Sequence, residues 1–470
     1  MIKNENTVVI NEKDNVGVRL VGNDAVPTGH KFALCDIKTG DCVIKYGEII
    51  GRATADIKEG EWVHSHNLRS HLDESFSYTY NFAAKELPRS EGHFYGYLRP
   101  SGEVGIRNEI YILPTVGCVN DVCRRLEKDA QSLVGGSLDG IFSLTHQFGC
   151  SQLGDDGDNI KKLLSAVALN PNAAFVLIVG LGCENNTLDG MKAYLAPYGR
   201  ENIAFIKCQD EDDEHARGME ILRGFAAKAK DMKRERVPLS KLTVGLKCGG
   251  SDGFSGLTAN PLLGRISDRL IAAGGSAILT EVPEMFGAEQ ILMNRCESEE
   301  IFEQYKSMIE NFKDFYTSQG FPVYENPSPG NREGGITTLE EKSLGCIKKA
   351  GESKIVEVLG YGERRQKDGL CVLDAPGNDL IAATALAAAG CQMVLFTTGR
   401  GTPFSTFVPT MKIATNTRIA EKKKNWIDFC AYSMDEDALF DLILQTANGE
   451  YTCLGEDVRE IAFFKTGVTL

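Results

Sequence analysis

Short apolar runs separated by glycine-rich turns fill the first part of the chain. The runs alternate apolar and polar positions over a few residues, which is the pattern of half-buried strands. Gly29, Gly40, Gly47 and Gly60 punctuate them. This pattern predicts a small all-β domain over residues 1–72. Its predicted strands are residues 15–20, 31–34, 42–45, 49–53 and 62–66.

From residue 104 the apolar runs alternate with helical stretches. Such alternation predicts βαβ units and mainly parallel sheets. A charged stretch at 228–236 separates two such regions, so we expect one α/β domain over 104–236 and a second over 237–470. Residues 73–103 lack clear periodicity and predict a linker. The predicted strands are 109–113, 140–144, 174–179 and 203–207 in the first α/β domain, and 242–246, 276–280, 370–373 and 393–397 in the second.

Size and charge narrow the class of protein. A chain of 470 residues is too long for one hydrophobic core. Its net charge of −14 argues against nucleic acid or an anionic membrane as partner. The polar first residues predict no export signal, and no apolar run is long enough to cross a bilayer, so we expect a cytoplasmic protein. None of the 14 cysteines forms a Cys-x-x-Cys pair, which excludes zinc ribbons and thioredoxin-type motifs.

The loop after the predicted strand 242–246 carries the densest set of polar groups. Strand, glycine-rich loop and helix is the layout in which backbone N–H groups converge on an anion. The loop lacks the ending of a phosphate-binding P-loop, and its thiol, hydroxyls, carboxylate and amide predict a polyhydroxylated acid as ligand. A second loop, at 397–404, offers a guanidinium between two glycines as a carboxylate clamp. The predicted substrate-binding residues are Cys248, Gly249, Gly250, Ser251, Asp252, Asn260 and Arg400.

Candidate acid–base groups follow the predicted strand 140–144. His146 is the preferred base or acid, because imidazole titrates near neutral pH. Asp155 and Asp156 lie in the same segment and complete the predicted catalytic set. Glu184 and Asp252 are alternatives, since burial raises the pKa of a carboxyl group toward neutrality.

Two metal-site hypotheses stay open. His64 and His66 are two residues apart on a predicted strand, so both imidazoles lie on one face and could bind a divalent cation. The alternative is an iron site, either a single iron or an iron–sulfur cluster, on thiols that lie near glycines. Its ligands would be Cys118, Cys150, Cys183 and Cys248. The loop at 179–186 begins like a dinucleotide fingerprint but has Asn185 in place of the third glycine, so we expect no nucleotide cofactor.

Ten segments spread along the chain resemble the altronate/galactarate dehydratase family. The resemblance implies an N-terminal β-clip domain of the SAF type fused to two α/β domains. It also implies dehydration of a sugar acid, here D-altronate to 2-dehydro-3-deoxy-D-gluconate in hexuronate catabolism, and dependence on a divalent metal, notably Fe²⁺. The segments are residues 29–34, 107–109, 113–120, 149–156, 182–186, 248–261, 280–289, 325–331, 412–416 and 465–470.

Alternatives to this reaction remain at this point. The same chemistry would serve galactarate or another hydroxy or sulfo acid, because few polar contacts decide among such substrates. A non-catalytic sugar-acid-binding protein is the alternative from a different class, and it would need hydrogen bonds but no base and no metal. A small β domain on a linker also invites exchange between subunits, so a homo-oligomer is compatible with the sequence.

Overall fold

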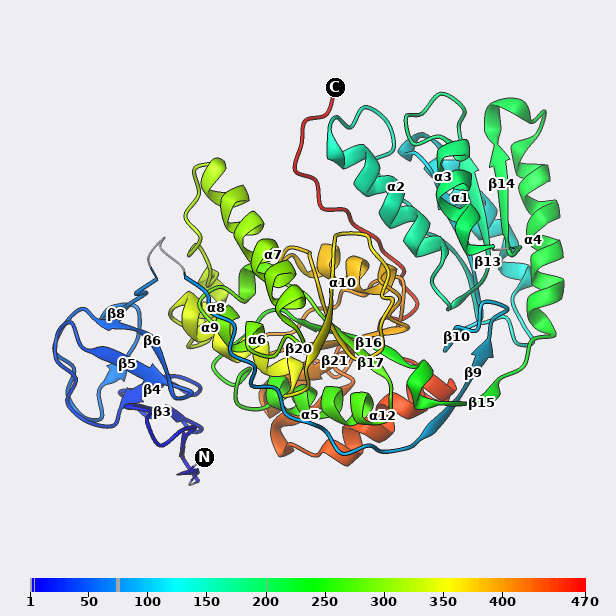
Figure 1. The fold of residues 1–470 in the computed structure, drawn as a ribbon. Coiled ribbons are helices and arrows are strands. Elements are labelled where there is room, and N and C mark those ends of the chain that lie inside the picture. Colours follow the sequence, from blue (N-terminus) through cyan, green and yellow to red (C-terminus); the bar gives the residue numbers. More distant parts are fainter. Residues whose placement is uncertain (1, 4, 73–76, 200) are drawn as a thin grey trace.

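Three regions follow one another along the chain in the computed structural model, which describes residues 2, 3, 5–72, 77–199 and 201–470. A small β region, blue in Figure 1, lies beside a central region built on a seven-stranded sheet. A region built on a four-stranded sheet lies on the other side of the centre. The predicted class, an all-β domain followed by α/β regions with parallel sheets, is confirmed.

The N-terminal region consists of two small antiparallel sheets. Buried valine, isoleucine and alanine side chains from both sheets form its core. The five-stranded sheet has the order β1 (Ile2–Lys3), β2 (Thr7–Val9), β3 (Val16–Arg19), β4 (Lys31–Ala33) and β7 (Trp62–Val63). The three-stranded sheet has the order β5 (Cys42–Lys45), β6 (Glu48–Ala53) and β8 (Leu68–Arg69).

The four-stranded sheet is parallel and covered by helices on both faces. Its strands are β11 (Glu109–Pro114), β12 (Gly140–Ser143), β13 (Ala173–Gly180) and β14 (Ile203–Lys207), in the order β12-β11-β13-β14. Helices α1 (Asn120–Ala130) and α4 (Glu214–Lys230) bury their apolar stripes against one face. Helices α2 (Asp155–Ala168) and α3 (Leu188–Leu195) cover the other. All eight residues of β13 are buried, as expected for a strand with both faces covered.

The seven-stranded sheet is also parallel. Its order is β18 (Ile355–Leu359), β19 (Leu370–Leu373), β17 (Ser276–Leu279), β16 (Thr243–Cys248), β20 (Met393–Thr398), β21 (Thr410–Ala414) and β22 (Phe429–Cys430). The helices of this region are α5 (Ala259–Ala272), α6 (Glu289–Met293), α7 (Glu299–Ser318), α8 (Pro329–Glu333), α9 (Leu339–Cys346), α10 (Asp379–Ala388), α11 (Thr417–Lys422) and α12 (Glu436–Asn448).

The strand order of this sheet reverses at β16. The chain proceeds from β16 through α5 to β17 on one side and later returns to place β20 on the other. In open parallel sheets a crevice forms at such a reversal, beyond the carboxyl ends of the strands, and ligands bind there. Cys248 is the last residue of β16, so this topology sets its thiol at the crevice.

The segments between regions are themselves held by hydrogen bonds. Residues 77–92 run along the central region, where Ala83 N donates to Asn294 O at 2.7 Å. The segment predicted as a linker ends in β9 (His93–Leu98), which pairs with β10 (Val104–Gly105) and β15 (Glu235–Pro238). The chain end, red in Figure 1, reaches the four-stranded region. None of the helices in the described residues is long and apolar enough to cross a membrane.

Candidate active site

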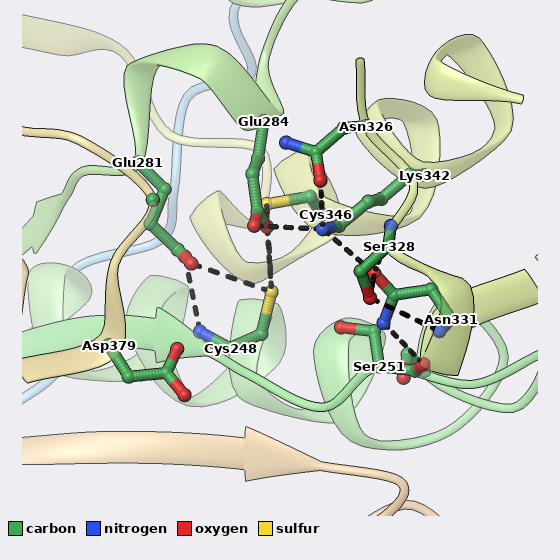
Figure 2. A network of polar contacts seen from close by, with 12 residues as sticks. Cys248, Ser251, Glu281, Glu284, Asn326, Ser328, Asn331, Lys342, Cys346 and Asp379 are labelled. Carbon is green, nitrogen blue, oxygen red and sulfur yellow. Dashed lines mark hydrogen bonds and ion pairs between the residues drawn. The ribbon is translucent and has the colours of Figure 1, made fainter.

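Two thiols and two carboxylates meet at the carboxyl end of β16. Cys248 ends that strand, Glu281 and Glu284 follow β17, and Cys346 ends α9. All four side chains are buried, and one ligand atom from each lies within 4.8 Å of the others. The two sulfurs are 3.7 Å apart, and each lies 3.7 Å from Glu284 Oε2 (Figure 2). Thiolate and carboxylate ligands in a buried set of this kind suit a divalent cation of borderline softness.

Three buried lysines surround this group and compensate its negative charge. Lys349 Nζ lies 2.9 Å from both sulfurs and 2.9 Å from Glu281 Oε2. Lys247 Nζ also bonds Glu281 and lies 2.9 Å from Asp379 Oδ1. Lys342 Nζ lies 3.0 Å from Glu284 Oε1. Buried ammonium and carboxylate groups persist only when paired, so the acidic and basic residues of this site depend on each other.

The pKa values of the two thiols shift in opposite directions. The hydrogen bond from Cys346 lowers the pKa of Cys248, and the Lys349 ammonium acts in the same direction against the effect of burial. The same contact with Cys248, together with burial, raises the pKa of Cys346 well above its usual value. Burial alone would lower the pKa of Lys349, but the neighbouring sulfurs and carboxylates raise it well above its usual value. The pKa of Cys248 therefore lies below that of Cys346, and the Lys349 ammonium contacts both sulfurs.

A small cavity borders the two sulfurs. Its volume is about 10 Å³, room for about one water molecule. Lys342 reaches across one side, where its Nζ lies 3.1 Å from both Asn326 Oδ1 and Asn331 Oδ1 (Figure 2). Asn331 Nδ2 in turn donates to Ser251 O at 2.9 Å, which ties the segment around α8 to the glycine-rich loop. The lining residues are Lys45, Tyr46, Cys248, Ser251, Asp252, Gly253, Ser255, Gly256, Asn260, Ile336, Glu341, Lys342, Gly345 and Cys346.

The N-terminal β region closes this cavity. Lys31 Nζ and Lys45 Nζ bond the two oxygens of Glu341 at 2.8 and 2.7 Å, and all three side chains are buried. Burial by itself would raise the pKa of Glu341, but the two ammonium ions hold it well below its usual range. Two glycines of the 248–261 loop allow the contact. A Cβ on Gly253 would lie 1.9 Å from the carbonyl oxygen of Gly29, and one on Gly256 would lie 2.2 Å from the Tyr46 hydroxyl oxygen.

The predicted substrate loop lies at this cavity, and most of its side chains have internal partners. Cys248, Ser251, Asp252 and Asn260 line the cavity. Asp252 accepts hydrogen bonds from Ser255, Thr415 and Asn416. Asn260 donates to Gly345 O and accepts from Thr397 Oγ1. Gly249 N donates to Thr397 O, and Gly250 adopts a φ of +59°. Arg400 lies outside the cavity, where its guanidinium bonds Gly330 O and Glu333.

The predicted imidazole site lies in the β region. The rings of His64 and His66 are 6.5 Å apart between centroids, and both contact Trp62. His64 Nε2 lies 2.9 Å from Arg332 O, so this face of the β region contacts α8. Neither histidine belongs to the Cys248 group, which is the single set of three or more close ligand residues in the described chain.

The predicted catalytic residues lie at the four-stranded sheet. His146 follows β12 and is buried; its Nε2 bonds Pro114 O at 2.8 Å, and its Nδ1 lies 3.2 Å from Phe148 N. Burial lowers the pKa of His146 to about 4. Asp155 is exposed at the start of α2. Asp156 is buried and accepts hydrogen bonds from the backbone of the chain end, at Thr466 and Gly467. A catalytic role for these residues stays a prediction.

The four cysteines predicted to form one iron site lie at two different sheets. Cys118, Cys150 and Cys183 lie on neighbouring loops beyond β11, β12 and β13, whereas Cys248 lies with Cys346. Glu184, the alternative base, accepts a hydrogen bond from Thr115 Oγ1 at 2.7 Å on the same loops. Sequence reasoning missed the other members of the Cys248 group and its lysines. Those residues are Glu281, Glu284, Cys346, Lys247, Lys342 and Lys349.

Comparison with known proteins matches most of the chain in three parts. A family model described as Altronate/galactarate dehydratase SAF domain matches residues 10–71. One described as D-galactarate dehydratase/Altronate hydrolase, second domain, matches residues 96–230. One described as D-galactarate/Altronate dehydratase, C-terminal, matches residues 239–469.

Full-length relatives agree with the family match. The chain is 50% identical to altronate dehydratase of Bacillus subtilis (strain 168), over 97% of this chain and 94% of the relative. It is 50% identical to altronate dehydratase of Escherichia coli (strain K12), over 95% of this chain and 92% of the relative. It is 33% identical to galactarate dehydratase (L-threo-forming) of Escherichia coli (strain K12), over 96% of this chain and 91% of the relative.

Proposed function

Because the chain belongs to the altronate/galactarate dehydratase family, we propose that it converts D-altronate to 2-dehydro-3-deoxy-D-gluconate and water. The identity of 50% to two altronate dehydratases, against 33% to a galactarate dehydratase, supports altronate as substrate. The observation that carries the proposal is the buried set of two thiols and two carboxylates at the strand-order reversal. A non-catalytic binding protein would not need these buried charges.

The reaction removes a proton from C2 and the hydroxyl group from C3. The resulting enol then takes a proton at C3 and becomes the 2-keto acid. The C2 proton is weakly acidic because the neighbouring carboxylate is already negative, so catalysis requires positive charge at the carboxylate and a base at C2. The C3 hydroxyl is a poor leaving group and requires an acid.

The Cys248 group fits a divalent cation, and Fe²⁺ is the proposed one. Cys248, Cys346, Glu281 and Glu284 would hold it, since two sulfurs and two carboxylates suit a metal between hard and soft. When bound, such a cation supplies positive charge that makes the C2 proton of a nearby hydroxy acid more acidic. In the structure Lys349 supplies the positive charge at this position, 2.9 Å from both sulfurs.

Lys342 is the proposed base at C2. Its ammonium group lines the cavity, and Glu284 overcomes the effect of burial and raises the pKa of Lys342 above its usual value. With Glu284 turned away, burial lowers the pKa of Lys342, the ammonium releases its proton to water, and the neutral amine then accepts the proton from C2. A lysine base beside a metal-held carboxylate is an established arrangement for this kind of proton abstraction.

Tyr46 is the proposed acid for the C3 hydroxyl. It lines the same cavity from the β region, and burial raises the pKa of its phenol, so the hydroxyl stays protonated. The neighbouring Lys45 would stabilise the phenolate after proton transfer, because its Nζ lies 4.9 Å from the centre of the Tyr46 ring. Ser251 and backbone N–H groups of the glycine-rich loop would hold the substrate hydroxyls. A cytoplasmic location and the lack of a nucleotide cofactor belong to the same proposal.

An anaerobic turnover assay tests this function. Purified protein with added Fe²⁺ would be offered D-altronate and galactarate, and formation of 2-keto-3-deoxy acid would be followed. We expect product from D-altronate, loss of product after chelation, and its return with Fe²⁺. Product from galactarate alone would show that galactarate, and not D-altronate, is the substrate. Thermal stabilisation by D-altronate without any product would contradict the enzymatic proposal.

A further inference from the structure

Three loops that each carry a cysteine meet at the carboxyl edge of the four-stranded sheet. Cys118 follows β11, Cys150 follows β12 and Cys183 follows β13. In each loop the residue before the cysteine is a glycine. These three strands are direct neighbours in the sheet order, so the thiols sit where parallel α/β sheets bind ligands.

Main-chain hydrogen bonds join the three loops to one another. Gly117 N donates to Phe148 O at 2.9 Å, which joins the first loop to the second. Asn186 N donates to Gly149 O at 2.9 Å, which joins the second to the third. Gly149 packs so tightly that a Cβ there would lie 2.0 Å from the carbonyl oxygen of Thr115. The cysteines are thus presented by one compact structure.

Solvent exposure distinguishes these thiols from the other cysteines. Of the 14 free cysteines only three are exposed, and two of them, Cys118 and Cys183, lie here. Cys150, on the loop after β12, is half-buried. Most free cysteines are buried as small apolar groups, so exposed thiols gathered on adjacent loops point to a ligand.

Polar side chains of the same loops hold the backbone in place. Asn120 Nδ2 donates to His146 O at 2.6 Å, and Thr115 Oγ1 donates to Glu184 Oε1 at 2.7 Å. Asn186 Nδ2 donates to Thr115 O at 3.0 Å. Asn186 is only 4% exposed, yet its Oδ1 has no hydrogen-bond partner among the described residues. A buried acceptor without a partner is costly, and a water molecule beside it would satisfy it.

We propose that Cys118, Cys150 and Cys183 hold a [4Fe–4S] cluster. A single ion would draw three thiolate sulfurs close together, since each Zn–S bond is only about 2.3 Å long. The three sulfurs do not form such a close set, because in the described chain only the Cys248 group has all its ligand atoms within 4.8 Å. A cluster presents its irons at separate corners, so its thiolates lie farther apart, and three thiolates leave one iron open to another ligand.

This site is separate from the proposed active site. The Cys248 group lies at the seven-stranded sheet and the three thiols lie at the four-stranded sheet. The chain end passes close to the second cysteine loop, where Leu470 N donates to Ser151 O at 2.9 Å. Cluster loading and altronate turnover can therefore be measured independently, and either proposal can fail without the other.

Anaerobic reconstitution with Fe²⁺ and sulfide tests the cluster. After desalting, we expect about four acid-labile sulfide per chain, about four iron per chain in addition to the single ion proposed at the Cys248 group, and a broad visible absorption band. Cys118→Ser, Cys150→Ser and Cys183→Ser should each lose most of the sulfide and the band. Cys35→Ser, which changes the remaining exposed cysteine, and Cys248→Ser, which changes the active site, should both retain them.

Three results would overturn this assignment. One is wild-type protein that holds no acid-labile sulfide and no more iron than the single ion proposed at the Cys248 group. Another is equal sulfide content in Cys183→Ser and wild type. The third is loss of the cluster in Cys248→Ser with retention in the three loop variants. Far-ultraviolet circular dichroism of each variant checks that the fold is intact, so that loss of the cluster reports the ligand and not unfolding.

Discussion

The sulfur atoms of Cys248 and Cys346 lie 3.7 Å apart although 98 residues separate them in sequence. This distance is a non-bonded contact, since a disulfide bond is about 2.05 Å long. The parallel sheet delivers one thiol at the end of β16, and the buried helix α9 delivers the other. A pair of buried sulfurs with two carboxylates beside it explains why three lysines are buried around them.

Removal of either thiol should abolish most of the activity. We expect Cys248→Ser and Cys346→Ser each to lower kcat by roughly 100-fold or more, because a charge-stabilising group at the reacting centre is lost. Both variants should also lose bound Fe²⁺, measured as metal content after gel filtration. Cys35→Ser in the β region is the matched control and should behave as wild type. Unchanged turnover in Cys346→Ser would show that Cys346 has no role in catalysis.

Loss of the Lys342 amine should affect the chemical step. We expect Lys342→Met to lower kcat with D-altronate by roughly 100- to 10,000-fold, the range for removal of a general base. Lys85→Met, which removes an exposed ion pair with Glu352, is the control. Steady-state kinetics would distinguish the roles. A raised KM at unchanged kcat would show that Lys342 anchors the substrate and is not the base.

Neutralising Glu341 should release the β region. Glu341→Gln leaves the ammonium groups of Lys31 and Lys45 buried without a counter-charge, and we expect a loss of about 3–5 kcal/mol in the free energy of unfolding. Urea denaturation measures it. Asp56→Asn, which breaks an exposed pair with Lys38, should leave stability nearly unchanged. A wild-type denaturation curve for Glu341→Gln would show that the buried triad does not hold the β region.

Acid should weaken the four-stranded region through His146. Its pKa is about 4 in the folded protein and near 6.5 when unfolded, so the unfolded chain binds the extra proton between these values. The contribution of His146 to stability is complete above pH 6.5 and falls by about 3 kcal/mol as the pH drops to 4. Urea denaturation of wild type and His146→Gln at pH 7 and pH 4.5 tests this. The variant should lose less stability on acidification, and an equal loss in both proteins would contradict the assignment.

The sequence predicted secondary structure correctly where the local pattern of apolar and polar residues was clear. Each predicted strand overlaps an observed one, because each is a short apolar run bounded by glycine or polar turns. The predicted strand 62–66 is wrong beyond Val63: His64 and His66 lie in the turn that follows β7 and do not share a strand face. Strands β18 and β21 were missed because Glu357 and Lys412 interrupt their apolar pattern. The Lys412 ammonium reaches the carbonyl oxygens of Thr410 and Leu454, an arrangement that only the tertiary structure shows.

Only part of the proposed active site, the loop that begins at Cys248, was predictable from the sequence. The Cys248 loop follows a strand and is rich in glycine, so its pattern identified it. Cys346 ends α9, a helix in which all eight residues are buried although Glu340, Glu341 and Lys342 are charged. In sequence such a helix looks like an exposed one, because the partners that neutralise its charges come from distant segments.

The way the regions are connected determines which of them can move. The two α/β regions are linked at several places, among them the β9–β15 ladder, the hydrogen bond from Asn170 Nδ2 to Ala387 O and the buried Arg107–Glu456 ion pair. Links at separate places resist rotation. The β region has a single covalent tether, and the cavity beneath it, about 10 Å³, is far too small for a six-carbon acid. Binding of the proposed substrate here requires the cavity to widen, and lifting of the β region, which closes it, would break the buried Lys31–Glu341–Lys45 contact.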